Sequence, residues 1–482
     1  MRKLYFALAV MLMSVASYAV AQRTEPNQNF NPDSTRTVSG TRIFHYKNGP
    51  VPVDLSVVQV AAYVPNGSGG YNVITGSGTS SGTFTIPNVP TGFYLLQLGR
   101  TYLATSNTVV NADINQDYRS NGVLADPDTT VTFDLTNLHP WQSTDLFEMV
   151  CPNTAAFNTF NGTVGDTTLT GTFPYVGVLS DGSEGDQNFI LQLITQNVGG
   201  YPFTAAGRGF LPPRFTQQQG GDTRISGRLT AIPQTHKFEA NINGADLTAQ
   251  ALAANPNATL TDTTIFLDVT PGSLAKGETT SGPDLVAYNY GTGQPFITTN
   301  GDLGPVAYGN PFPPSGWSVW DYYGWTATVN YFAPGATNST AIDTLTVGFD
   351  THLPTPTNPI KPMIGVVTKP TLNGRDFFED QTGVGLTPTL KWSAPRVGTA
   401  TFYQVQIYQL DNDGGNTVQA LIASLRTPSR SLTVPQGLLG AGPGYVFRIR
   451  PWYVPGLNFA KTPFMFGPTH AQADVISGMM QP

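Results

Sequence analysis

The stretch of sequence that decides the fold runs from Pro388 to Trp452. It contains the runs Pro388-Thr-Leu390-Lys-Trp392, Tyr403-Gln-Val405-Gln-Ile407 and Tyr445-Val-Phe447-Arg-Ile449-Arg, in which apolar side chains alternate with polar ones. A period of two is typical of strands that bury one face. The runs lie close together and are separated by segments that contain glycine and proline. They therefore predict one small β-sandwich.

The order of these runs resembles that of a fibronectin type III module. Trp392 comes early, and Leu438, Leu439 and Gly444 stand just ahead of Tyr445. The resemblance covers about the last quarter of the chain and implies a modular extracellular protein. It also implies that Trp392 and Tyr445 serve the core and the corner of the module. Modules of this kind carry no chemistry of their own.

Length and composition indicate several β domains. A chain of 482 residues suggests about three domains, at roughly 150 residues each. The 25 Asp, 51 Gly and 39 Pro favour turns, whereas only 6 Glu and 8 Lys are present to favour exposed helices. The formal charge of -7, without basic clusters, disfavours nucleic acid or anionic lipid as a partner.

Residues 1–21 have the layout of a secretory signal peptide. Two basic residues precede an apolar run, and small residues end at Ala21, which is the pattern of a cleaved signal. The apolar run is short for a membrane span. We therefore expect a secreted mature chain without a membrane span, and the polar, aperiodic residues 22–37 predict a flexible leader.

A second pattern is Gly82-Thr-Phe84-Thr-Ile86-Pro-Asn-Val89-Pro-Thr-Gly92-Phe-Tyr94-Leu. It predicts a strand that ends at Pro87, a turn with Pro90 and Gly92, and a following strand that begins with aromatic residues. The segment resembles the signature of carboxypeptidase-regulatory-like domains. The resemblance implies a transthyretin-like β-sandwich over residues 38–135.

The central region, residues 136–352, contains many strand-like runs. Only residues 245–255 have apolar residues at helical spacing, and Pro256 ends this helix. Four prolines in residues 353–362 predict an extended linker, and residues 363–482 form the fibronectin type III-like domain with a C-terminal tail. We expect an all-β, multidomain protein in which two sandwiches, immunoglobulin-like or transthyretin-like, flank an irregular β-rich domain with one short helix.

Oxygen-bearing side chains gather between residues 113 and 128, partly at alternate positions. Alternate oxygens can surround a hard cation such as calcium, although residues 118 and 124 are Tyr and Leu, where an EF-hand loop needs Gly and Glu. We weigh a solvated loop above a cation site and keep weak calcium binding as a hypothesis. The candidate ligands are Asp113, Asn115, Asp117, Asp126 and Asp128.

Residues 317–325 hold three of the six tryptophans of the chain. Flat aromatic rings stack on sugar faces, so this segment is a candidate contact for a glycan or another partner. Aromatic residues are also the largest contributors to a β core, and we weigh packing above ligand binding. The residues concerned are Trp317, Trp320, Tyr322, Tyr323 and Trp325.

The sequence contains no recognisable catalytic constellation. Gly78-Thr-Ser80-Ser-Gly82 matches the G-x-S-x-G pattern of serine hydrolases, but the required strand-to-helix turn is absent, and we interpret the segment as a hairpin loop. The five histidines are scattered without zinc spacing. Cys151, the only cysteine, excludes an intrachain disulfide, and we interpret it as a buried apolar side chain.

These features favour a secreted bacterial protein that binds at a surface or in a matrix without catalysis. Its partner would be an extracellular protein or polysaccharide, and no cofactor other than calcium is indicated. Two alternatives stay open. One is an extracellular, carbohydrate-active hydrolase, which converging carboxylates in a pocket of the central domain would favour. The other is a structural subunit of an extracellular assembly, in which exposed strands pair between chains.

Overall fold

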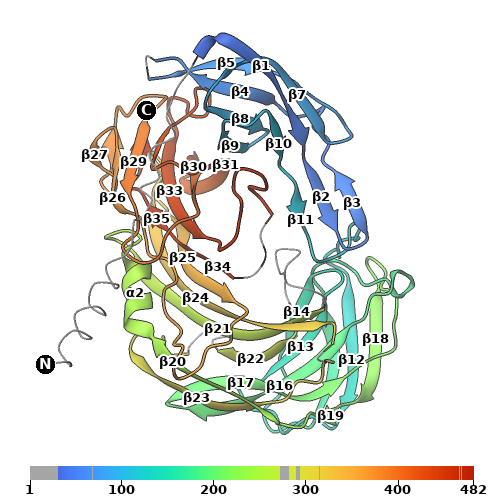
Figure 1. The fold of residues 1–482 in the computed structure, drawn as a ribbon. Helices are drawn as coiled ribbons and strands as arrows, with labels where there is room; N and C mark the ends of the chain where they lie inside the picture. The colour runs from blue at the N-terminus through green and yellow to red at the C-terminus, as the bar shows by residue number, and fades with distance from the viewer. Residues whose placement is uncertain are drawn as a thin grey trace, which may run out of the picture.

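The computed structural model describes residues 31–67, 69–271, 282–288, 294–313, 315–465, 467 and 469–482. The predicted signal peptide (residues 1–21) and the start of the predicted leader (residues 22–30) lie outside this range. The described chain is built almost entirely of strands, which confirms the all-β, multidomain prediction (Figure 1). It contains one α-helix, α2 (Gly244–Leu252), and one 3-10 turn, η1 (Gly182–Glu184).

The first region is a sandwich of short strands, drawn in blue to cyan in Figure 1. Its strands are β1 (Asn31–Thr41), β2 (Ile43–Tyr46), β3 (Gly49–Pro52), β4 (Val60–Pro65), β5 (Tyr71–Thr75), β6 (Ser77–Gly78), β7 (Thr83–Thr91), β8 (Tyr94–Leu98), β9 (Thr101–Thr105), β10 (Val109–Asn111) and β11 (Ile114–Asn115). The hairpin interpretation of Gly78–Gly82 is confirmed, because β6 pairs with β7 on either side of it.

Two expectations for this region are wrong in detail. β1 begins at Asn31 and pairs with β7, so residues 31–37 form a strand instead of a leader. Backbone pairing, which leaves no apolar pattern in the sequence, orders this segment. β7 also continues through Pro87, because the register with β1 shifts between Arg36 and Val38 and leaves the proline outside the ladder. A bulge of this kind accommodates a residue without an N–H group.

The central region is the largest. Its strands are β12 (Thr130–Thr136), β13 (Leu146–Cys151), β14 (Ala156–Phe160), β15 (Thr168–Pro174), β16 (Phe189–Val198), β17 (Tyr201–Phe210), β18 (Asp222–Arg228), β19 (Thr230–Ala231), β20 (His236–Asn243), β21 (Thr259–Pro271), β22 (Asp284–Tyr288), β23 (Asn300–Tyr308), β24 (Trp317–Tyr331) and β25 (Thr340–Asp350). β12 pairs with β15 and β18, so the boundary predicted at residue 135 falls inside a strand of the central region. Alternation predicts this strand but does not reveal its partners.

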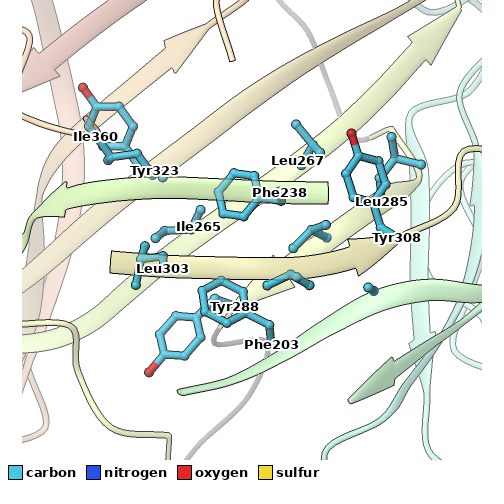
Figure 2. Close-up of a cluster of buried hydrophobic side chains, with 14 of the residues drawn as sticks. Phe203, Phe238, Ile265, Leu267, Leu285, Tyr288, Leu303, Tyr308, Tyr323 and Ile360 are labelled. Atoms are coloured by element: carbon cyan, nitrogen blue, oxygen red, sulfur yellow. The ribbon is translucent and has the colours of Figure 1, made fainter. Parts of the chain in front are cut away.

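The main core of the central region lies between its sheet and a layer made by β20, β23 and α2. Figure 2 shows Phe238 of β20 and Leu303 of β23 among side chains of the sheet such as Ile265 and Tyr288. Burying a large apolar side chain of this kind contributes about 1.5–3 kcal/mol. The predicted helix is confirmed, and Leu247 on its buried face belongs to the same core.

The C-terminal module, orange to red in Figure 1, follows the proline-rich segment. Its strands are β26 (Thr368–Leu372), β27 (Arg375–Asp376), β28 (Gln381–Thr382), β29 (Thr389–Ser393), β30 (Phe402–Asp413), β31 (Asn416–Thr427), β32 (Ser431–Thr433), β33 (Gly444–Tyr453), β34 (His470–Ala473), β35 (Val475–Ile476) and β36 (Met480–Gln481). Trp392 and Tyr445 lie in its core. The Tyr445 hydroxyl accepts from the amide of Gly440 at 2.8 Å and donates to its carbonyl at 3.3 Å, which is the corner role expected from the sequence.

The proline-rich segment, residues 353–362, is extended but docked on the central region. Ile360 is buried in the central core, and the Asn241 side-chain amide donates to the carbonyl of Pro356 at 2.6 Å. The segment is therefore part of the folded structure and does not act as a free spacer.

One sheet of 20 strands runs through all three regions. β25 pairs with β34, which joins the central region to the C-terminal module, and β31 pairs in parallel with β9, which joins the module to the first sandwich. The first sandwich in turn touches the central region, where the amide of Arg119 donates to the carbonyl of Asn153 at 2.7 Å. The three regions therefore close on one another (Figure 1).

Candidate binding groove

The predicted aromatic cluster lies on β24, where successive side chains point to opposite faces of the sheet. Trp325 is fully buried, and its indole N–H donates to the carbonyl of Ile297 at 3.1 Å. Tyr323 lies in the central core, and its hydroxyl donates to the carbonyl of Lys361 at 2.7 Å (Figure 2). These two side chains fill the core, as the packing interpretation expects.

The other three aromatic residues of the cluster pack against rings of neighbouring segments. Trp320 is buried and stacks on Phe349 with 5.7 Å between ring centroids, and Tyr322 contacts the same ring at 4.8 Å. Trp317 packs on Phe312 at 4.4 Å. Only Trp317 and Tyr322 keep partial exposure among the five residues. The cluster therefore does not form one exposed platform for a ligand.

The candidate calcium ligands belong to separate local structures. One oxygen of Asp113 accepts from the Thr41 hydroxyl at 2.9 Å and from the amide of Ile43 at 3.0 Å. Asp126 accepts from the amide of Asp128 at 3.1 Å and so holds its own turn. Asn115 lies in β11, with Asp117 just after it. Within the described ranges, no three His, Cys, Asp or Glu side chains are placed to hold a metal ion, and calcium binding stays a prediction.

A chelator experiment tests the calcium hypothesis. A cation that binds the folded state but not the unfolded chain raises the melting temperature, and the rise grows with the logarithm of the cation concentration above the dissociation constant. If the hypothesis holds, EDTA lowers the melting temperature of the purified protein by a few degrees and added calcium restores it. An unchanged melting temperature, with no heat of calcium binding in calorimetry, would remove the hypothesis.

A groove of about 740 Å³ lies between the first sandwich and the C-terminal module. One wall is the turn before β5 with Tyr71 at the start of β5, together with Leu95 of β8 and Phe93, which directly precedes β8. The other wall is β29 with residues 427–433. The walls come from opposite ends of the chain, and the pairing of β31 with β9 brings them together.

The walls of the groove are held in place by hydrogen bonds. The Tyr71 hydroxyl donates to the carbonyl of Thr433 at 3.0 Å, and burial raises the pKa of Tyr71, so it stays a neutral donor. The Asn66 side chain accepts from the amide of Gly70 at 3.1 Å and closes the turn. Gly67 has φ of +75° there, a conformation that glycine adopts without steric cost.

The lining combines aromatic rings, hydroxyl groups and basic charge. Trp392 is 5% exposed, so it closes the bottom of this wall as part of the module core, and its indole N–H has no hydrogen-bond partner among the described residues. Lys391 and Arg430 are exposed at the groove, and no acidic residue lines it. Hydroxyl groups line it at Ser393, Ser429, Ser431 and Thr433, whereas Thr427 is buried. The Ser431 hydroxyl also donates to the carbonyl of Leu390 at 3.3 Å, and those of Thr433 and Thr389 are 3.0 Å apart.

Buried carboxyl groups form a different cluster in the central region. Asp268 of β21 faces Asp284 of β22, and Glu148 of β13 accepts from the amide of Asp284 at 3.3 Å. Burial raises the pKa of all three, that of Asp284 to about 6, and the charge of Asp284 raises those of Glu148 and Asp268 further. The sequence does not reveal this cluster, because its members lie far apart along the chain.

The buried carboxyl cluster is a poor place for a ligand. Glu148, Asp268 and Asp284 are 0%, 6% and 3% exposed. Carboxyl groups with raised pKa values suit acid–base chemistry, but at this burial a substrate does not reach them. The groove is accessible to a ligand and is lined by aromatic rings, hydroxyl groups and basic charge. We therefore take it as the candidate site.

Comparisons with known proteins leave the chain without an assigned family. A scan of protein-family models finds no match, and a search of curated proteins finds no similar chain. The resemblances to fibronectin type III and carboxypeptidase-regulatory-like domains therefore stay predictions. In the described part of the chain, no helix has the length and apolar character needed to cross a membrane.

Proposed function

We propose that this protein is a secreted, non-enzymatic binding protein that holds a saccharide chain in the groove between the first sandwich and the C-terminal module. The lining of the groove carries the proposal. Aromatic side chains offer faces for the apolar side of sugar rings, and serine and threonine hydroxyls can donate to and accept from sugar hydroxyls.

The rigidity of the groove also supports a binding role. Tyr63 and Tyr102 of the first sandwich share one core with Phe447 of the C-terminal module. The two walls are therefore fixed relative to each other before a ligand arrives. Preorganised walls reduce the entropy that is lost on binding.

A glycan array tests the proposal, with Phe93→Ala as the groove variant. Phe93 lines the groove and is only partly buried, so its removal takes away a stacking surface. We expect wild-type protein to bind a subset of glycans and the variant to bind them about twofold to tenfold more weakly, since one aromatic contact contributes about 0.5–1.5 kcal/mol.

Phe332→Ala is the matched control, because Phe332 is 52% exposed and does not line the groove. This control should bind glycans as the wild type does, and melting curves should show that both variants fold. Absence of binding across plant, microbial and host glycans, or equal losses in the two variants, would contradict the proposal.

The hydrolase alternative has one observation in its favour, the convergence of Glu148, Asp268 and Asp284. If a bound glycan is cleaved, and cleavage is lost in Asp284→Asn while binding persists, the protein is a hydrolase whose active site lies in the central region. We rank this alternative second because the carboxyl groups are buried.

A further inference from the structure

We propose that the groove selects acidic saccharides, whose carboxylate or sulfate groups pair with Lys391 and Arg430. This inference rests on the proposed saccharide-binding function and adds the charge of the ligand.

The two basic residues lie side by side on one wall of the groove. Lys391 of β29 is opposite Ser431 of β32 in the strand pairing, and Arg430 directly precedes Ser431. The amide of Trp392 donates to the carbonyl of Arg430 at 3.0 Å, which fixes the backbone of both residues. Both basic residues therefore belong to the wall that β29 and residues 427–433 form, and both line the groove.

Neither basic side chain pairs with an acidic residue among the described residues. No ion pair joins Lys391 or Arg430 to an acidic residue in the part of the chain that the structure describes. Arg119 and Arg450, by contrast, each form a close ion pair with a buried aspartate. In a chain with a formal charge of -7, a groove lined by basic side chains and no acidic ones is a local positive site. Such a site attracts anionic ligands and stabilises them by charge-assisted hydrogen bonds.

The rest of the lining favours an acidic sugar over an acidic peptide. Phe93 and Tyr71 supply partly exposed aromatic surface, and the two walls carry several hydroxyl groups. An acidic peptide would use the charge of the groove but would leave much of this aromatic and hydroxyl surface without a partner. An acidic saccharide would contact the basic side chains, the aromatic surface and the hydroxyl groups.

Calorimetry with matched ligand pairs tests the inference. A galacturonic acid hexamer is compared with its methyl-esterified form, and dextran sulfate with uncharged dextran, so that carboxylate and sulfate are distinguished. We expect one acidic ligand to bind at least tenfold more tightly than its neutral partner at low salt. We also expect the difference to shrink as salt is added, because exposed charges are screened.

The double variant Lys391→Gln/Arg430→Gln removes the positive charge of the groove. We expect it to bind the acidic ligand about tenfold to a hundredfold more weakly than the wild type and to lose most of the salt dependence. The matched control is Arg375→Gln/Lys461→Gln, which removes two exposed basic residues outside the groove. This control should bind as the wild type does, and melting curves verify the fold of both proteins.

The outcomes separate this inference from the proposed function. Equal binding of acidic and neutral saccharides, or wild-type affinity of the groove double variant, would overturn the inference and leave a neutral glycan site. Tight binding of poly-glutamate without binding of any saccharide would overturn both the inference and the saccharide proposal, in favour of an acidic peptide. Binding of none of these ligands would contradict the proposed function itself.

Discussion

Asp474→Ala is expected to lower the free energy of unfolding by about 3–5 kcal/mol, because it leaves buried guanidinium charge without a partner. The Asp474 carboxylate accepts from Nε and Nη2 of Arg450 at 2.6 and 2.9 Å, and Arg448 lies 3.6 Å away. It also accepts from the amide of Leu345 in β25 at 3.0 Å. The substitution should therefore loosen the joint between the central region and the C-terminal module.

The pH dependence of this effect has a definite sign. Burial by itself would raise the pKa of Asp474, but Arg450 and Arg448 hold it below its usual value. A depressed pKa in the folded state stabilises the protein above the unfolded pKa of about 3.9, and this gain is lost as the pH falls through the folded-state pKa. The difference between variant and wild type should therefore shrink in strong acid.

Urea unfolding at pH 7 measures the effect of Asp474→Ala. Asp413→Ala is the control, because Asp413 is exposed at the end of β30, and such changes usually stay within about 0.5 kcal/mol. A loss for Asp474→Ala no larger than that of the control would show that the buried ion pairs do not hold the module in place.

Asp321→Asn should stabilise the protein by about 2–4 kcal/mol at pH 8 and by almost nothing near pH 4. Burial, reinforced by the charge of Asp350 on the neighbouring strand, raises the pKa of Asp321 to about 8. The unfolded chain loses this proton near pH 3.9. At a pH between these two pKa values, unfolding releases a proton. The free energy of unfolding therefore falls as the pH rises from the lower pKa to the higher one.

The asparagine resembles the protonated carboxyl group and does not titrate, so its advantage should grow from about pH 4 to about pH 8 and then level off. Thermal or urea unfolding across this range measures it, with Asp302→Asn as the control on an exposed strand position. A constant advantage at all pH values, or a loss of stability at pH 8, would show that Asp321 is ionised in the folded protein.

The elements that depend on local pattern could be predicted from the sequence. The alternation around Trp392 and Tyr445 predicts strands that the structure confirms, and the helical spacing in residues 245–255 predicts α2. Elements that depend on distant partners could not. β1 has little apolar pattern to mark it, and β12 alternates equally well whichever region it joins.

The candidate site could not be predicted from the sequence for the same reason. Its walls meet only because β31 pairs with β9 from the other end of the chain. Neither the glycine-rich turn before Tyr71 nor the isolated Lys391 and Arg430 has a signature by itself. The aromatic segment on β24 stood out in the sequence, but aromatic richness does not distinguish a core from a surface, and Tyr323 and Trp325 belong to the core.

Hydrogen–deuterium exchange, with and without a saturating acidic saccharide, tests most directly whether the groove is the binding site. We expect slower exchange in residues 65–71 and 427–433, which form opposite walls of the groove. Residues 317–325, which lie in β24, should be unaffected. Protection confined to β24, or to the strands around Asp268 and Asp284, would show that the ligand binds in the central region and not in the groove.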